Sequence, residues 1–295
     1  MQKFPLVKAS SAGLMCLVLF FPESADAQQH KGGAFQLKRD GIGCPECQAL
    51  DGYLPPNEIP LVLYQMVGKI RKGDKDEDVR IQKVRGATPT GTYPKFVNDG
   101  NCPEIDSEKW AIDYSHKRSG AAIHKGIDIP QPEGTPVLAA ASGTVVGKFL
   151  NQNNRKGIEV VLRHTPAQTG LSFYTYTQYT HLLEMSPLPI GASVLMGDEI
   201  AKISNTGKMG NKIRRDALHF AVMYSESPGW TNDGTIVVPQ ASYWMDPVFF
   251  YSTAGPYDSV SVERRSNKAI LTPYITRTGT VVPAETNRIW PFACQ

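Results

Sequence analysis

The sequence predicts a mainly β protein, in which disulfides hold irregular N- and C-terminal flanks to an antiparallel β-sheet domain. Short β-branched or aromatic runs recur between residues 137 and 203, with turn residues between them. No stretch of this region has a convincing helical period. Cysteines stand only before and after the region, which suggests that disulfides hold the flanks.

The expected elements follow from local patterns. A short helix is expected within residues 55–70 after the prolines, and the charged run 71–80 is expected to be a solvated loop. The β-rich domain is expected to begin at Trp110. Gly197 and Asp198 separate the last two of its strands and predict a short hairpin. The expected strands are 137–139, 144–149, 158–163, 171–179, 194–196, 199–203 and, in the C-terminal flank, 269–276.

The first 27 residues are typical of a secretory signal peptide. Lys3 and Lys8 give a positive start, an apolar run follows at residues 12–21, and Ala25-Asp26-Ala27 is an A-x-A cleavage site. The apolar run is too short to span a bilayer as a mature helix. We expect an exported, periplasmic or secreted protein that begins at Gln28 and has no stable membrane insertion.

Export removes Cys16 with the signal peptide and leaves an even set of cysteines. In an oxidising compartment four cysteines allow three pairings, which the sequence leaves open. The Cys44-Pro-Glu-Cys47 pattern also occurs in redox and zinc sites, but no thioredoxin-like βαβ pattern surrounds it and no second C-x-x-C follows. Structural disulfides are therefore expected among Cys44, Cys47, Cys102 and Cys294.

The chemistry-bearing residues are the histidines and the aspartate of two short segments. His124-Lys-Gly-Ile-Asp128 is one segment, and Leu218-His219-Phe220 is the other. Histidine and carboxylate are ligands that zinc takes from proteins, at about 2.0–2.2 Å, and three protein ligands with an open position are typical of catalytic zinc. His124, Asp128 and His219 are the candidate zinc ligands, and His181 between them is the candidate proton-handling group.

The local sequence also predicts how the ligands are presented. Four residues of straight strand span roughly 13 Å, which is long for two side chains that meet on one ion. The chain is therefore expected to bend between His124 and Asp128, and Gly126 permits the bend. Around His219, the apolar residues Leu218 and Phe220 alternate with Ala217, His219 and Ala221. This alternation predicts a strand in which Leu218 and Phe220 face away from the histidine.

Residues 124–250 resemble the lysostaphin-type, or LytM-domain, zinc endopeptidases, which cleave peptide cross-bridges in bacterial cell walls. Five blocks agree in order and spacing: HKGIDIPQPEGTPVLAAASGTVVGKF at 124–149, IEVVLRH at 158–164, YTHL at 179–182, IGASVLMGDEIAKISNTGK at 190–208 and ALHFAV at 217–222. The resemblance implies a LytM-like metallopeptidase domain at 110–255. The remaining divisions are a signal peptide at 1–27, an irregular region at 28–109 and a C-terminal extension at 256–295.

The resemblance also implies roles for single residues. In the family, the histidine and aspartate of H-x-x-x-D and the second histidine of H-x-H bind zinc, which correspond to His124, Asp128 and His219. The histidine of Y-x-H-L assists catalysis and corresponds to His181. The family's first H-x-H histidine is Ala217 here. Alanine neither polarises a water molecule nor stabilises a tetrahedral intermediate, so the metal ligands are complete while the catalytic histidine pair is halved.

Three functions remain open on the sequence. The first is a zinc endopeptidase acting on peptidoglycan, slowed by Ala217. The second is a non-hydrolytic peptidoglycan-binding protein or an activator of other cell-wall hydrolases. The third is a structural part of an envelope apparatus with envelope protein partners. The net charge of +3, which removal of Lys3, Lys8, Glu23 and Asp26 leaves unchanged, does not indicate nucleic acid as a partner.

Overall fold

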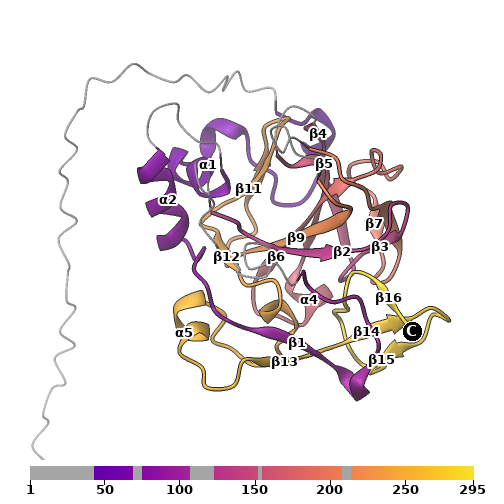
Figure 1. The fold of residues 1–295 in the computed structure, drawn as a ribbon. Coiled ribbons are helices and arrows are strands. Elements are labelled where there is room, and N and C mark those ends of the chain that lie inside the picture. The colour runs from indigo at the N-terminus through magenta and orange to yellow at the C-terminus, as the bar shows by residue number, and fades with distance from the viewer. Residues whose placement is uncertain (1–42, 69–74, 107–122, 152–154, 208–213) are drawn as a thin grey trace, which may run out of the picture. The chain divides into compact units, whose positions relative to one another are not determined.

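The computed structural model describes residues 43–68, 75–106, 123–151, 155–207 and 214–295. Its main sheet is antiparallel, with the strand order β12-β9-β6-β5-β4-β7, and β2 pairs with β9 as well (Figure 1). The predicted signal peptide, Cys16 and the expected start at Trp110 lie outside the described residues. The strands of this sheet are β2 (Ile127–Pro130), β4 (Gly143–Asn151), β5 (Gly157–His164), β6 (Tyr174–Leu182), β7 (Ser193–Val194), β9 (Ala217–Ser225) and β12 (Tyr243–Met245).

Smaller sheets flank the main one. In the part of the chain that the structure describes, three of them are two-stranded. The pair of residues 93–96 with residues 269–272 is parallel and joins the two flanks of the chain. The C-terminal extension adds a sheet of three strands in the order β15-β14-β16. The pairs are β3 (Pro136–Leu138) with β8 (Glu199–Lys202), β10 (Trp230–Asn232) with β11 (Val237–Pro239), and β1 (Tyr93–Phe96) with β13 (Ala269–Thr272); the last sheet comprises β14 (Tyr274–Thr276), β15 (Val281–Val282) and β16 (Ala293–Cys294).

The predicted fold class is confirmed, and most expected strands are present with shifted ends. The expected hairpin at Gly197 and Asp198 is wrong, because the strands on its two sides do not pair with each other. Instead β7 pairs with β4 and β8 pairs with β3. The expected strand 269–276 is also divided, because Pro273 separates β13 from β14 and proline lacks the N–H that a strand donates.

Helices are short and lie mainly in the N-terminal flank. The helix expected within 55–70 is confirmed as α1 (Leu61–Val67), which ends at Gly68 in a left-handed conformation. Of the expected loop at 71–80, residues 71–74 lie outside the described residues, and the prediction is wrong for the rest, where α2 (Lys75–Val84) begins. Within the described ranges, the other helices are η1 (Pro45–Cys47), η2 (Pro56–Glu58), η3 (Val97–Asp99), α4 (Pro166–Thr169), η4 (Phe249–Tyr251) and α5 (Ser259–Glu263).

Two features explain why this charged run is helical. Its acidic residues, among them Asp76 and Asp78, lie in the first turn, where the helix dipole favours negative charge, and Lys83 lies in the last turn. One face is also buried against α1, where the Gln65 side-chain amide donates to the Asp78 carboxylate at 2.9 Å. The charged composition of this segment is therefore compatible with a helix, because one of its acidic side chains has a buried polar partner.

The main sheet separates two apolar clusters. One side of β9 carries Leu218 and Phe220 into a cluster that includes Ile127 and Ile129 of β2. The other side carries Ala221 and Met223 into a second cluster, to which α1 contributes. Every second residue of a strand points to the same side, so His219 lies on the side of Ala221. Among the described residues, no helix has the length and apolar character needed to cross a membrane.

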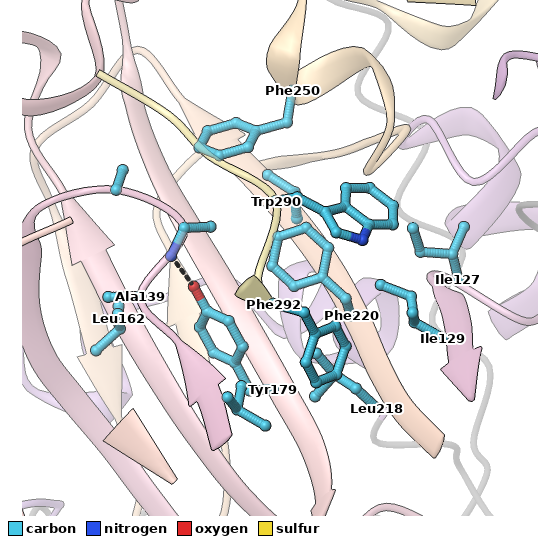
Figure 2. Close-up of a cluster of buried hydrophobic side chains, with 14 of the residues drawn as sticks. Ile127, Ile129, Ala139, Leu162, Tyr179, Leu218, Phe220, Phe250, Trp290 and Phe292 are labelled. Carbon is cyan, nitrogen blue, oxygen red and sulfur yellow. Dashed lines mark hydrogen bonds between the residues drawn. The ribbon is translucent and has the colours of Figure 1, made fainter. Parts of the chain in front are cut away.

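The C-terminal extension packs behind β2 and β9. Figure 2 shows Trp290 and Phe292 beside Ile127, Ile129 and Phe220, in one buried cluster. The Trp290 indole N–H donates to the Pro103 carbonyl at 2.9 Å, which joins this segment to the N-terminal flank. The two flanks are therefore part of the core that supports these strands.

The structure pairs Cys44 with Cys47 and Cys102 with Cys294. The predicted use of the four cysteines in structural disulfides is thereby confirmed, and one of the three open pairings is selected. The second disulfide links positions 192 residues apart and joins the chain's tail to the N-terminal flank. The first closes a loop with a separation of only 3 residues.

Loss of the long-range disulfide is expected to destabilise the protein more than loss of the local one. A cross-link stabilises mainly by restricting the unfolded chain, and its effect grows with the size of the loop that it closes. The double variant Cys102→Ser/Cys294→Ser should lose about 2–5 kcal/mol of unfolding free energy. Urea unfolding measures this, with Cys44→Ser/Cys47→Ser as the control. Equal losses in the two variants would contradict the argument.

Candidate metal centre

The pairing of β2 with β9 places two of the candidate ligands opposite each other. Asp128 is the direct antiparallel partner of His219. Residues directly opposite in an antiparallel pair project from the same face of the sheet, and the isoleucines on both sides of Asp128 point into the core on the other face. The His219 ring Nδ1 lies 2.8 Å from Asp128 Oδ1.

The third candidate ligand reaches the same point from outside the strand. His124 precedes β2, and the chain bends at Gly126, as the spacing predicted. A Cβ atom at Gly126 would lie 2.8 Å from His219 Nε2 and 2.4 Å from the Phe220 carbonyl oxygen. Only glycine allows this close approach of the loop to β9, and the approach brings the His124 and His219 rings to a centroid distance of 4.7 Å.

The three side chains converge through one atom each. His124 Nε2 lies 3.0 Å from His219 Nδ1 and 3.3 Å from Asp128 Oδ1. In a tetrahedron with bonds of about 2.0–2.1 Å, any two ligand atoms of zinc lie roughly 3.3 Å apart. The observed separations are close to that value, and His124 and Asp128 are buried while His219 is partly exposed. The donor set and its spacing therefore fit zinc.

Electrostatics support the same reading. Burial alone would raise the pKa of the Asp128 carboxyl, but the imidazoles of His124 and His219 hold that pKa well below its usual range. Asp128 is therefore a carboxylate at neutral pH. Two ring nitrogens that lie 3.0 Å apart and both face this carboxylate oxygen form a cluster that a cation can bind through three atoms.

His181 lies near the end of β6, close to the cluster. Its ring centroid is 5.9 Å from that of His219. Its Nδ1 is 2.9 Å from the Lys156 carbonyl oxygen, which also accepts a hydrogen bond from the His181 backbone N–H at 3.2 Å. A carbonyl oxygen only accepts, so Nδ1 carries the proton and Nε2 carries the lone pair. The residue has a φ of 68°, an uncommon value for a residue other than glycine.

His181 is also kept neutral. Burial is the larger cause and the positive charge of Arg214 the next, and together they hold the pKa of His181 well below its usual range. The side chain is therefore an uncharged imidazole at neutral pH, with a lone pair that is able to accept a proton.

Ala217 occupies the position beside this histidine. It is the partner of Pro130 in the β2–β9 pair and lies two residues before His219, on the same face of β9. The Ala217 N–H donates to the Ser204 carbonyl at 3.3 Å, and the Ser204 N–H donates to the His181 carbonyl at 2.9 Å. The backbones of Ala217 and His181 are thus both hydrogen-bonded to Ser204. The side chain of residue 217 is only a methyl group.

Two further buried residues of this region, His164 and Arg214, differ in their relation to the cluster. His164, the other buried histidine of the sheet, is hydrogen-bonded to Ser142 and Thr177, and burial lowers its pKa to about 4. It is not one of the clustered donors among the described residues. Arg214, by contrast, lies beside His181 and was not predicted from the sequence, because no residue pattern marks a buried arginine that lies before a strand.

A β-sheet with two histidines and an aspartate converging on one point, beside a neutral histidine, is a candidate metallohydrolase centre. Residues 122–229 match the model of Peptidase family M23, and this part of the chain is therefore similar to that family of peptidases. The predicted resemblance is thereby confirmed, and all four candidate site residues lie within the matched range.

Individual proteins are also similar to this chain. The chain is 25% identical to the "Uncharacterized lipoprotein YgeR" of Escherichia coli strain K12, over 74% of this chain and 87% of that protein. It is 40% identical to an "Uncharacterized metalloprotease" of Haemophilus influenzae, over 28% of this chain and 16% of that protein. A solved structure, the catalytic domain of lysostaphin from Staphylococcus simulans, is 23% identical with a TM-score of 0.30, over 44% of this chain and 82% of that domain.

Proposed function

We propose that the mature protein is a zinc metalloendopeptidase that hydrolyses peptide cross-bridges of peptidoglycan. The observation that carries the proposal is the convergence of His124, Asp128 and His219 at separations of 2.8–3.3 Å inside a peptidase-family domain. These three residues would hold the ion. When bound, zinc supplies a Lewis acid and lowers the pKa of a coordinated water to about 7. Peptidoglycan as substrate rests on the resemblance to lysostaphin-type endopeptidases.

The chain's own proton acceptor is His181. Its Nδ1–H is engaged by the Lys156 carbonyl, which leaves the Nε2 lone pair for a proton from the nucleophilic water. Because the imidazole is neutral at the start, it can take up this proton and then return it to the leaving amine. Asp128 stays ionised throughout, since its pKa lies far below neutrality. General acid–base catalysis by such a group contributes typically about 100- to 10,000-fold in rate.

A second candidate function is supported by Ala217. A protein that binds peptidoglycan, or activates other cell-wall hydrolases, needs a surface that binds the peptide but not the second catalytic histidine. The two readings differ in turnover, because a zinc-loaded binding module would hold the cross-linked peptide without cutting it. The complete set of ligand residues favours the enzyme, since binding alone gives no evident reason to keep a metal site.

The proposed setting is the periplasm or the cell exterior. The signal-peptide pattern at residues 1–27 supports export, and two disulfides suit an oxidising compartment. We keep the division into an N-terminal region at 28–109, a metallopeptidase domain at 110–255 and an extension at 256–295 as part of this proposal. Envelope proteins are the proposed partners of a non-hydrolytic form.

Incubation of zinc-loaded mature protein with defined muropeptides tests the proposal, with mass spectrometry as the readout. The enzyme should release peptides cut at a single type of cross-link. The control His181→Asn should keep its zinc and lose about 100- to 10,000-fold in rate. Asparagine suits this position because it tolerates a positive φ. Absence of any cleavage by the wild-type protein, with zinc and peptidoglycan both bound, would favour the binding module.

A further inference from the structure

Arg214 and His181 are hydrogen-bonded to neighbouring carbonyl groups of one turn. The Arg214 guanidinium Nη2 donates to the Arg155 carbonyl at 3.1 Å. The next carbonyl along the chain, that of Lys156, accepts from both the ring and the backbone of His181. The position of the Lys156 carbonyl therefore depends on what holds the turn in place.

The turn is also held by close packing at Gly157. Gly157 has a φ of 68°, and a Cβ atom there would lie 2.4–2.5 Å from Thr206. The Thr206 hydroxyl accepts from the Ile158 N–H at 3.1 Å and donates to the Leu182 carbonyl at 2.8 Å, next to His181. Because Gly157 packs against Thr206 and the Arg155 carbonyl accepts from Arg214, the Lys156 carbonyl between these two residues is fixed relative to the His181 ring.

The direction of this carbonyl decides the chemistry of His181. When the carbonyl faces Nδ1, the proton stays on Nδ1 and the Nε2 lone pair remains available. If the turn moved and this hydrogen bond were lost, the imidazole would populate the other tautomer as well, in which Nε2 carries the proton and cannot accept one. The backbone of His181, with its positive φ, would also lose one of its hydrogen bonds.

We propose that Arg214 is a positioning residue, which fixes the Nδ1–H tautomer of His181 by holding the turn at residues 155–157. The role of His181 as proton acceptor rests on the proposed function, but the tautomer does not. Arg214 lies three residues before Ala217, the first residue of β9, and it is only 8% exposed. Where the family has a second histidine, this chain relies on a single histidine that is firmly oriented by an arginine.

The test is the tautomeric state of His181, measured by ¹⁵N NMR of the histidine rings in the full-length mature protein loaded with zinc. The wild type should show Nδ1–H only. Arg214→Gln should show both tautomers at His181 and a loss of 10-fold or more in kcat with little change in KM and with one zinc per chain. Arg214→Lys keeps a donor and the charge. It should recover part of the Nδ1–H population of His181 and part of kcat.

Arg215→Gln is the matched control. Arg215 carries the same side chain one residue further on, but its partner is Asp106, so its loss should leave the His181 tautomer unchanged. An Nε2–H tautomer in the wild type would overturn the proposal without any variant, even if Arg214→Gln failed to fold. A pure Nδ1–H signal in Arg214→Gln would also overturn it. Failure of the proposed function would appear separately, as a wild type with the predicted tautomer and no hydrolysis.

Discussion

Replacement of His219 by alanine is expected to abolish stoichiometric zinc binding. His219 Nδ1 is the central atom of the cluster, 2.8 Å from Asp128 Oδ1 and 3.0 Å from His124 Nε2. Its removal leaves two protein ligands, whereas catalytic zinc sites ordinarily have three. Elemental analysis after extensive dialysis should give about one zinc per wild-type chain and a small fraction of that in the variant. Hydrolysis of muropeptides should fall with the metal content.

The control is another buried strand histidine outside the cluster. His164→Gln removes an imidazole that is hydrogen-bonded to Ser142 and Thr177, so it should lower stability but keep the zinc. Asp128→Asn, which keeps the shape of the side chain and removes its charge, should resemble His219→Ala. If His219→Ala retained one zinc per chain, the ligand assignment would be wrong.

The sequence predicted the cluster because its residue types and spacing are restrictive. Alternation around His219 correctly implied a strand, and the distance along the chain from His124 to Asp128 correctly implied a bend. The register that sets Asp128 opposite His219 was not predictable, since it depends on which of many strands become neighbours. Pairing also explains the wrong hairpin: Gly197 and Asp198 are good turn residues, but β7 and β8 each pair with a different strand.

The packing of the C-terminal extension against β2 was also not predictable from the sequence. Trp290 and Phe292 lie far along the chain from β2, yet they pack against Ile127 and Ile129, the residues on both sides of Asp128 (Figure 2). The disulfide from Cys102 to Cys294 holds this segment to the N-terminal flank. Because packed cores transmit displacements of neighbouring side chains, loss of the disulfide is expected to loosen the ligand strand as well as the tail.

Replacement of Ala217 by histidine is expected to raise the hydrolytic rate by about 100- to 1000-fold without changing the zinc content. Residue 217 shares a face of β9 with His219, and its backbone is linked through Ser204 to His181. A histidine there would add a donor for the charge that develops on the scissile carbonyl oxygen. One such donor is worth roughly 2.7–4 kcal/mol of transition-state stabilisation, which corresponds to this range of rates.

The design separates a new donor from a new side chain. Ala217 is only 4% exposed, so any larger residue must displace neighbours, and Ala217→Phe measures that effect with a ring that has no nitrogen. The phenylalanine variant should keep its zinc and gain no activity, while the histidine variant should gain activity mainly in kcat, because the added hydrogen bond forms in the transition state. A histidine variant that binds zinc and peptidoglycan yet cleaves no muropeptide would mean that the site binds peptidoglycan without hydrolysing it, and the binding module would then replace the enzyme as the proposed function.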